Sequence, residues 1–253
     1  MKKLGGIFWA VLAALILGLA CNKSEEKKPG SDSTPPTASE STGGGTGDST
    51  SETPPPSMDS LPANLKHEGF AYYGLGNTGE LGFEVISSLA PGPSTGNASS
   101  KLVAIEGGAA KFITSRTGPL AQLGDEELEV RPDGIYNTRL GGEPVEPAQL
   151  VIPSELPKGK TWTTKGSVKL ATGKTLDQNI DYTVVGIEKV TTKAGEFDAL
   201  KVTAKGQIKF DGKTSQSQVA AWYVKDLGIV KMTISTDVPK GTMKVELLKK
   251  PGA

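Results

Sequence analysis

The chain has 253 residues and carries 28 basic and 28 acidic residues, so its formal net charge at pH 7 is zero. Because the basic residues are dispersed among other polar residues, the sequence lacks the basic patch or stripe that nucleic-acid binding requires. A single cysteine excludes a disulfide within the chain, and a single histidine leaves too few ligands for the usual zinc sites built from cysteine and histidine.

The N-terminal segment has the parts of a bacterial export signal. A pair of lysines precedes an uncharged stretch from Leu4 to Ala20, which ends in small side chains directly before Cys21. The five residues that end at this cysteine, Leu-Gly-Leu-Ala-Cys, resemble the lipobox of bacterial lipoproteins. The resemblance implies that residues 1–20 are a signal peptide. It also implies that the thiol of Cys21 is acylated, with palmitate as an expected acyl group.

Two other interpretations of this segment stay open. A stretch of about 17–25 apolar residues is long enough to be a retained transmembrane helix, and ordinary secretion needs only the cleavage. The glycines and the small-residue exit favour cleavage. One acyl chain binds a membrane only marginally, so stable anchoring through Cys21 needs more than one. Asn22 follows the cysteine in place of the aspartate that marks inner-membrane retention. We therefore expect a lipid-anchored protein of the bacterial cell envelope, at the outer membrane rather than the inner.

Residues 21–66 are predicted to be a lipidated cysteine followed by a disordered linker. Ser, Thr, Gly, Pro, Glu and Lys dominate this stretch, and few of its side chains are apolar enough to offset the entropy of ordering the chain. Treated as a flexible coil, it has a root-mean-square reach of about 35–40 Å. The linker is thus expected to hold the folded part clear of the lipid surface.

Residues 67–253 are predicted to form one antiparallel β domain. Apolar and polar residues alternate with a period of two, and Gly and Asp-Gly interrupt the alternation. The expected strands are Phe70–Gly74, Gly82–Ser88, Lys101–Glu106, Ala110–Arg116, Glu126–Arg131, Gly134–Arg139, Gln149–Ile152, Trp162–Ala171, Gln178–Glu188, Ala199–Phe210, Thr214–Lys225, Gly228–Ser235 and Thr242–Leu248.

Two turns give the most definite local predictions. The sequence Arg131-Pro132-Asp133-Gly134 predicts a hairpin, because proline fixes one turn dihedral and glycine admits a positive φ. Asp211-Gly212 predicts a second hairpin between two strongly alternating segments. Since exposed sheet edges have to be paired or covered, we expect a mainly β fold with a curved sheet or a partly open barrel.

The last hundred residues resemble the TapB-like envelope proteins. The resemblance is carried by GKTW at 159–162, by AGEFDALKV at 194–202 and by WYVKDLGIVK at 222–231. It implies an exported antiparallel β domain, broadly like lipoprotein-carrier half-barrels, and supplies no catalytic residue. The shared glycines and aromatic residues also have an explanation in turns and core packing.

Three patterns in the sequence are of a type found in catalytic or metal sites. His67 lies at the edge of the linker, so we expect it to be exposed and not part of a catalytic triad. Residues 74–79 fit G-x-G-x-x-G, but a strand-like run follows them, which indicates a turn and not a dinucleotide site. Acids at 125–127 and Glu129 are of the type that binds calcium or hydrolyses glycosides, yet alternating acids beside a turn usually face water. We expect no enzyme activity, no metal and no cofactor.

Aromatic residues in the strands are the remaining candidate site. If the sheet curls without closing, an apolar groove could hold an acyl chain or a partner segment, although an ordinary packed core is the simpler interpretation. The leading hypothesis is a non-enzymatic binding or scaffolding domain with an envelope protein as partner, and the alternative is a carrier of lipid or another hydrophobic ligand. The residues assigned to the groove are Trp162, Tyr182, Phe210, Trp222 and Tyr223.

Overall fold

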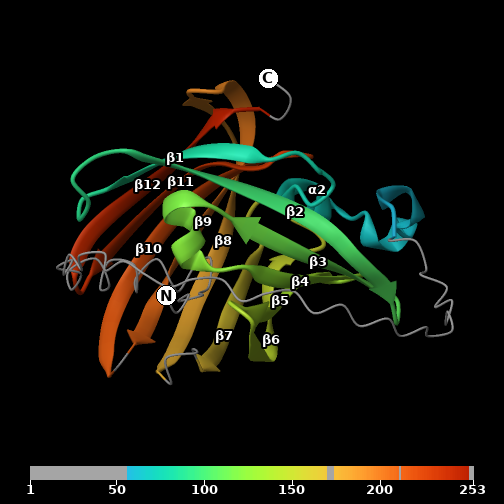
Figure 1. Cartoon of the computed structure of the whole chain (residues 1–253), viewed down its shortest axis with the longest axis horizontal. Helices are drawn as coiled ribbons and strands as arrows, with labels where there is room; N and C mark the ends of the chain where they lie inside the picture. Colours follow the sequence, from blue (N-terminus) through green and yellow to red (C-terminus); the bar gives the residue numbers. More distant parts are fainter. Residues whose placement is uncertain (1–55, 170–173, 211, 251–253) are drawn as a thin grey trace, which may run out of the picture.

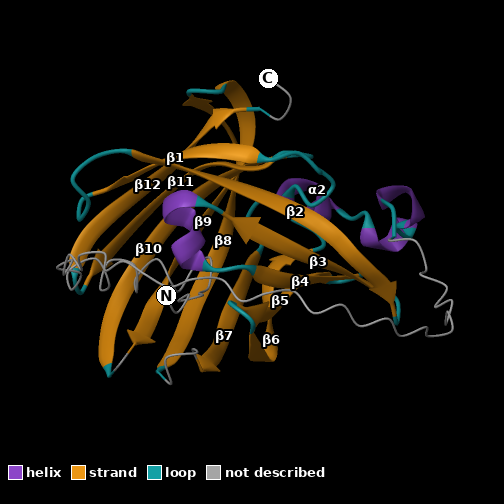
Figure 2. Ribbon diagram, viewed as in Figure 1, coloured by secondary structure: helices purple, strands orange, loops and turns teal. Residues whose placement is uncertain are grey.

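The computed structural model describes residues 56–169, 174–210 and 212–250. Antiparallel strands dominate this part of the chain, as Figures 1 and 2 show. The expected mainly β class is therefore confirmed, and each expected strand from Gly82 onward overlaps a strand of the structure. The strands are β1 (Leu81–Ser87), β2 (Ser94–Glu106), β3 (Ala109–Arg116), β4 (Glu126–Arg131), β5 (Gly134–Leu140), β6 (Glu143–Pro153), β7 (Thr161–Lys169), β8 (Thr175–Thr192), β9 (Gly195–Phe210), β10 (Lys213–Val224), β11 (Gly228–Asp237) and β12 (Lys240–Lys249).

The sheet closes into a barrel. Each strand pairs with the next along the chain, and β1 pairs with β12. Both predicted hairpins are present, since Arg131 pairs with Gly134 and Phe210 pairs with Lys213. Closure leaves no free edge, which is the outcome that the alternating strands favour.

The seam between β6 and β7 is the weakest part of the closure. Its register holds one pair, Glu146 with Ser167, and β6 contains prolines that donate no backbone hydrogen bond. Side chains reinforce it from inside the barrel. Gln149 of β6 reaches over Gly166 of β7, which has no side chain in the way, and accepts a hydrogen bond from Gln178 of β8. The barrel is thus closed at this point largely by side chains.

Short helices cover one end of the barrel. They are η1 (Met58–Ser60), η2 (Ala63–Leu65) and α2 (Glu68–Tyr73), while a further 3-10 helix, η3 (Gly118–Leu123), links β3 to β4. Leu61 and Leu65 are 3% and 0% exposed, and Phe70 packs against Phe112 inside the barrel with ring centroids 6.0 Å apart. The ordered domain thus begins before the predicted boundary at residue 67, because a few leucines of the expected linker bury themselves in the barrel end.

The strand expected at Phe70–Gly74 is wrong, because these residues form α2 and its end. His67 caps the helix by accepting a hydrogen bond from the backbone N–H of Phe70 through Nδ1 (3.0 Å). Gly74 ends the helix in the left-handed conformation, with φ of 79°. None of the helices in the described ranges is both long enough and apolar enough to cross a membrane.

Candidate functional site

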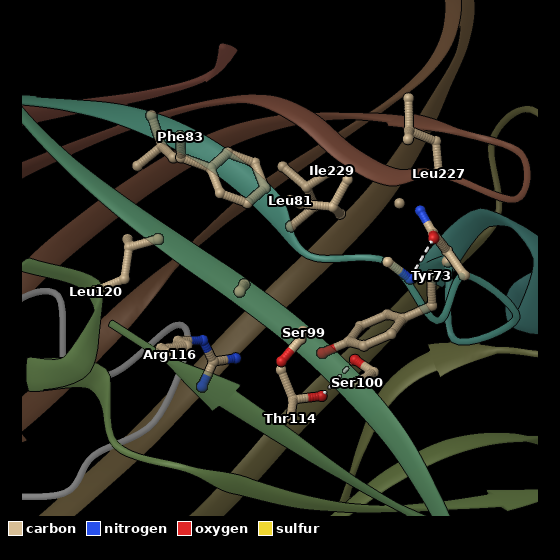
Figure 3. Close-up of a pocket in the computed structure, with 16 residues that line it drawn as sticks. Tyr73, Leu81, Phe83, Ser99, Ser100, Thr114, Arg116, Leu120, Leu227 and Ile229 are labelled. Atoms are coloured by element: carbon tan, nitrogen blue, oxygen red, sulfur yellow. Dashed lines mark hydrogen bonds between the residues drawn. The ribbon is translucent and has the colours of Figure 1, made fainter. Parts of the chain in front are cut away.

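A pocket opens inside the barrel beside α2. The space between its lining residues amounts to about 700 Å³, and this figure includes space that is open to solvent. Figure 3 shows side chains from β1, β2, β3 and β11 around it, together with Tyr73 of α2. The larger apolar side chains that line it are Leu81, Phe83, Leu120, Leu227, Ile229 and Val245.

The pocket is positioned by close contact between the end of α2 and the turn that joins β10 to β11. The backbone N–H of Asp226 donates to the carbonyl of Ala71 at 2.8 Å. A Cβ at Gly74 would lie 2.6 Å from the backbone nitrogen of Gly228, so only glycine allows this approach. Gly228, the glycine of the Asp-Leu-Gly turn, therefore has a structural role. It lets the turn pack closely against α2, and this contact holds Tyr73 over the first residues of β11.

One side of the pocket is polar. The hydroxyls of Ser100 and Thr114 share a hydrogen bond of 2.9 Å, and the guanidinium group of Arg116 lies beyond them. Arg116 donates to Glu126 Oε2 at 2.6 Å and to the carbonyl of Gly124 at 2.7 Å. The side chains of Arg116 and Glu126 are only 1% and 2% exposed. Such a pair is tolerated inside a protein because each charge compensates the other.

The hydroxyl of Tyr73 lies deep in the same pocket and points toward the side that holds Ser100 and Thr114 (Figure 3). Burial raises the pKa of Tyr73 well above 10, and the carboxylate of Glu126 raises it further. The hydroxyl accepts or donates no hydrogen bond within the described ranges. The ring remains partly accessible because it forms part of the pocket wall. Tyr73 thus presents a neutral donor that lacks a protein acceptor.

The aromatic residues predicted to line a groove are dispersed instead. Tyr182 and Tyr223 point inward and are 2% and 4% exposed, and burial raises the pKa of both hydroxyls. Trp162 stacks on Tyr182 with ring centroids 4.9 Å apart. Phe210 lies near the end of the β9–β10 hairpin, with the ammonium group of Lys174 5.4 Å from its ring. None of these residues lines the pocket described above.

Trp222 lies on the outer face of β10. Its indole N–H donates to Glu188 Oε1 at 2.6 Å, and this hydrogen bond is the largest cause of the lowered pKa of Glu188. The ammonium groups of Lys201 and Lys231 lie 5.1 and 5.8 Å from its ring centroid. Because neighbouring residues of a strand face opposite sides, Trp222 and Tyr223 cannot share one groove. The five aromatic residues therefore do not line one common groove. Tyr182 and Tyr223 belong to the core, whereas Trp222 belongs to a cluster on the outer surface.

The polar residues singled out from the sequence have structural roles. His67 is half-buried and not exposed as expected, since Nε2 lies 3.1 Å from the carbonyl of Arg131 while Nδ1 caps α2. Its pKa is lowered, mainly by burial. Glu126 faces inward, whereas Glu127 and Glu129 form ion pairs with arginines on the outer face. The described residues contain no group of three or more potential metal ligands. Cys21 lies outside the described residues.

Sequence reasoning missed Tyr73 and Arg116, which both line the pocket. The incorrect strand at Phe70–Gly74 hid the helix that carries Tyr73. Arg116 was placed in a strand correctly, and the alternation of β3 puts it on the inner face together with Thr114. The signal in the sequence was a charged residue at an inward position of an alternating strand, because a buried charge needs a partner inside the protein.

Comparison with known proteins places the fold. The model of a DUF3108-like family matches residues 145–235, which is part of the barrel. The fold is similar to that of a proposed lipoprotein from Parabacteroides distasonis, with a TM-score of 0.51, 13% identity, and coverage of 71% of this chain and 98% of that one. A proposed exported protein with a YmcC-like fold from Bacteroides fragilis gives a TM-score of 0.50, 13% identity, and coverage of 68% and 95%. No curated protein sequence matches the chain.

Proposed function

We propose that the chain is a lipid-anchored protein of the bacterial cell envelope whose barrel binds a hydrophobic ligand and catalyses no reaction. The pocket inside the barrel carries this proposal, because it joins apolar walls to a few convergent polar groups. Of the two functions expected from the sequence, ligand carriage fits the pocket better than scaffolding does. A scaffold needs a surface for its partner and has no use for an interior space.

The proposed location rests on the N-terminal segment and on the similar proteins. The lipobox-like residues before Cys21 support acylation of its thiol and removal of residues 1–20. A proposed lipoprotein and a proposed exported protein share the barrel fold, and the TapB-like motifs between 159 and 231 fall in the stretch that the DUF3108-like model matches. Asn22 supports the outer membrane over the inner.

Binding is proposed in preference to catalysis because of the groups that the pocket presents. They are hydroxyls, the carboxamide of Asn77 and a guanidinium group that Glu126 neutralises. The imidazole of His67 is engaged at both nitrogens by backbone groups and does not line the pocket, so it is poorly placed to act as a general base. The arrangement holds a molecule in place and offers no base beside a nucleophile.

Two experiments test this proposal. For the anchor, the wild-type chain and Cys21→Ser are expressed with labelled fatty acid. The label and membrane fractionation are expected only for the wild type, and equal labelling of both would contradict acylation at Cys21.

For the pocket, the chain that begins at residue 21 and carries Cys21→Ser is examined by native mass spectrometry and by lipid extraction. The substitution ensures that no acyl chain attached to the protein enters the pocket. We expect a bound hydrophobic molecule at a ratio of one per chain. Its amount should fall in Ala98→Leu, which fills part of the pocket, but not in Ala220→Leu, which lies on the outer face of β10. A chain that carries no ligand and takes none up would refute carriage.

A further inference from the structure

The pocket has two chemically different sides. Side chains of β1, β11 and β12 supply an apolar wall, represented by Phe83, Ile229 and Val245. The opposite side carries hydroxyls from α2, β2 and β3 and is backed by the guanidinium group of Arg116 (Figure 3). A molecule that fills this space must therefore be amphiphilic, with one polar group at the end of an apolar body.

The polar side offers hydrogen-bond donors. The Tyr73 hydroxyl stays protonated throughout the neutral range because burial disfavours the phenolate, and it has no acceptor among the described residues. Ser100 and Thr114 share one hydrogen bond, so the hydroxyl that accepts it keeps a proton for another partner. Because Tyr73 lines the pocket, a ligand oxygen there would supply the acceptor that its hydroxyl lacks among the described residues.

The electrostatics of this side favour an oxygen atom over a cation. Arg116 lines the pocket, whereas its carboxylate partner Glu126 does not. The positive member of the pair is thus nearer to the ligand. It adds to the hydroxyl dipoles, which are free to turn their protons toward a ligand oxygen, and it disfavours an ammonium head group.

The size of the pocket limits the ligand to one chain. About 700 Å³ includes the space open to solvent, so the enclosed part is smaller than this value. Because each buried methylene strengthens binding, a chain of moderate length is sufficient as the apolar part of the ligand. A lipid with two long acyl chains would leave one of them outside.

We propose that the pocket binds a single acyl chain and that the carbonyl or carboxylate oxygen of this chain accepts a hydrogen bond from the Tyr73 hydroxyl. The inference rests on the proposed function and specifies its ligand. A free fatty acid and an acyl ester share this chemistry, and both fit the donor set of Tyr73 and Thr114.

The test uses the chain that begins at residue 21 with Cys21→Ser, and calorimetric titration with three probes of equal chain length. Decanoic acid and methyl decanoate carry the proposed oxygen acceptor, and decyltrimethylammonium carries a cation. We expect the acid, the ester or both to bind with one site per chain. The ammonium probe is expected to bind at least several-fold more weakly.

Tyr73→Phe removes one hydroxyl and keeps the ring. Loss of one hydrogen bond is expected to weaken binding of the acyl probes about 2- to 10-fold. Tyr72→Phe is the matched control, because Tyr72 belongs to the same helix but points toward Lys225 and does not line the pocket. It should leave the affinity unchanged, and thermal unfolding of both variants verifies that they fold.

The outcomes separate this inference from the proposed function. If Tyr73→Phe binds the acyl probes as well as the wild type does, or if the ammonium probe binds equally tightly, the assignment of an acyl oxygen to Tyr73 is overturned while ligand binding stands. If no probe binds and the purified chain holds no lipid, the proposed function is refuted. Preference for the acid or for the ester identifies the source of the acyl group, and either preference supports the inference. The comparison of probes on the wild type remains decisive if Tyr73→Phe does not fold.

Discussion

Arg116 and Glu126 form an ion pair that is shielded from water, and removal of either charge is predicted to destabilise the protein. Arg116 Nη2 lies 2.6 Å from Glu126 Oε2, with side chains 1% and 2% exposed. Arg116 also donates to the carbonyl of Gly124 at 2.7 Å. In Arg116→Met, the carboxylate and this carbonyl both lose a donor inside the barrel, where water does not replace it.

The expected magnitude follows from this geometry. Removing one partner of a buried ion pair costs about 3–5 kcal/mol, and we expect Arg116→Met to lie in this range. Glu126→Gln should cost less, about 1–3 kcal/mol, because its carboxamide oxygen still accepts a hydrogen bond from Arg116. Since domains are stable by only about 5–15 kcal/mol, the first substitution removes a large part of the total.

Urea unfolding followed by tryptophan fluorescence measures these free energies. Glu127→Gln is the matched control, since its neighbouring pair with Arg139 is 3.3 Å long but 46% and 47% exposed, and such pairs contribute at most about 1 kcal/mol. The double variant Arg116→Met/Glu126→Leu should recover most of the loss, because no charge is left buried alone. The reasoning is refuted if Arg116→Met costs no more than Glu127→Gln, or if the double variant is no more stable than Arg116→Met alone.

Two further predictions concern the helix that carries Tyr73. Burial lowers the pKa of His67 below 6.5 in the folded protein, so His67 binds a proton more readily in the unfolded chain than in the folded one. The contribution of the neutral ring to stability is therefore complete above about pH 6.5 and is lost as the pH falls below this value. Denaturation between about pH 8 and pH 5 should show this loss in the wild type but not in His67→Asn, which caps without titrating. Gly74→Ala should lower the unfolding free energy by more than about 1 kcal/mol, because of its φ of 79° and the backbone of Gly228.

Each of these predictions has an outcome that contradicts it. Equal pH dependence of the wild type and His67→Asn would show that protonation of His67 does not cause the loss. Gly92→Ala is the control for the glycine, because no atom lies within 4 Å of its added Cβ. If Gly74→Ala is no less stable than Gly92→Ala, close contact between α2 and β11 is not what holds the pocket together.

Local patterns in the sequence were sufficient for the strands and hairpins. Alternation with a period of two depends only on neighbouring residues, so segments such as Gln178–Glu188 were found within the longer β8. The turns at Pro132-Asp133 and at Gly212 likewise depend on local backbone preferences. The proposed processing signal at Cys21 likewise rests on neighbouring residues alone.

The short helices that cover one end of the barrel could not be predicted from such local patterns. The stretch that contains Leu61 and Leu65 has too few apolar residues to fold alone, and it becomes ordered because the barrel end supplies the rest of the apolar surface. The segment Phe70–Gly74 was assigned as a strand because its helix is only six residues long, too short for a period to appear. Its conformation is stabilised by the His67 cap and by contacts with a turn more than 150 residues away.

The sequence by itself determined the fold class, the strand order along the chain and the residue at which lipid is expected to attach, since each depends on short-range chemistry. Only the tertiary structure decided that the sheet closes and that Tyr73, Thr114 and Arg116 meet in one pocket. Closure depends on the pairing of β1 with β12, and the pocket depends on a helix that packs against a distant turn. Such contacts leave no periodic trace in the sequence because their partners are far apart along the chain.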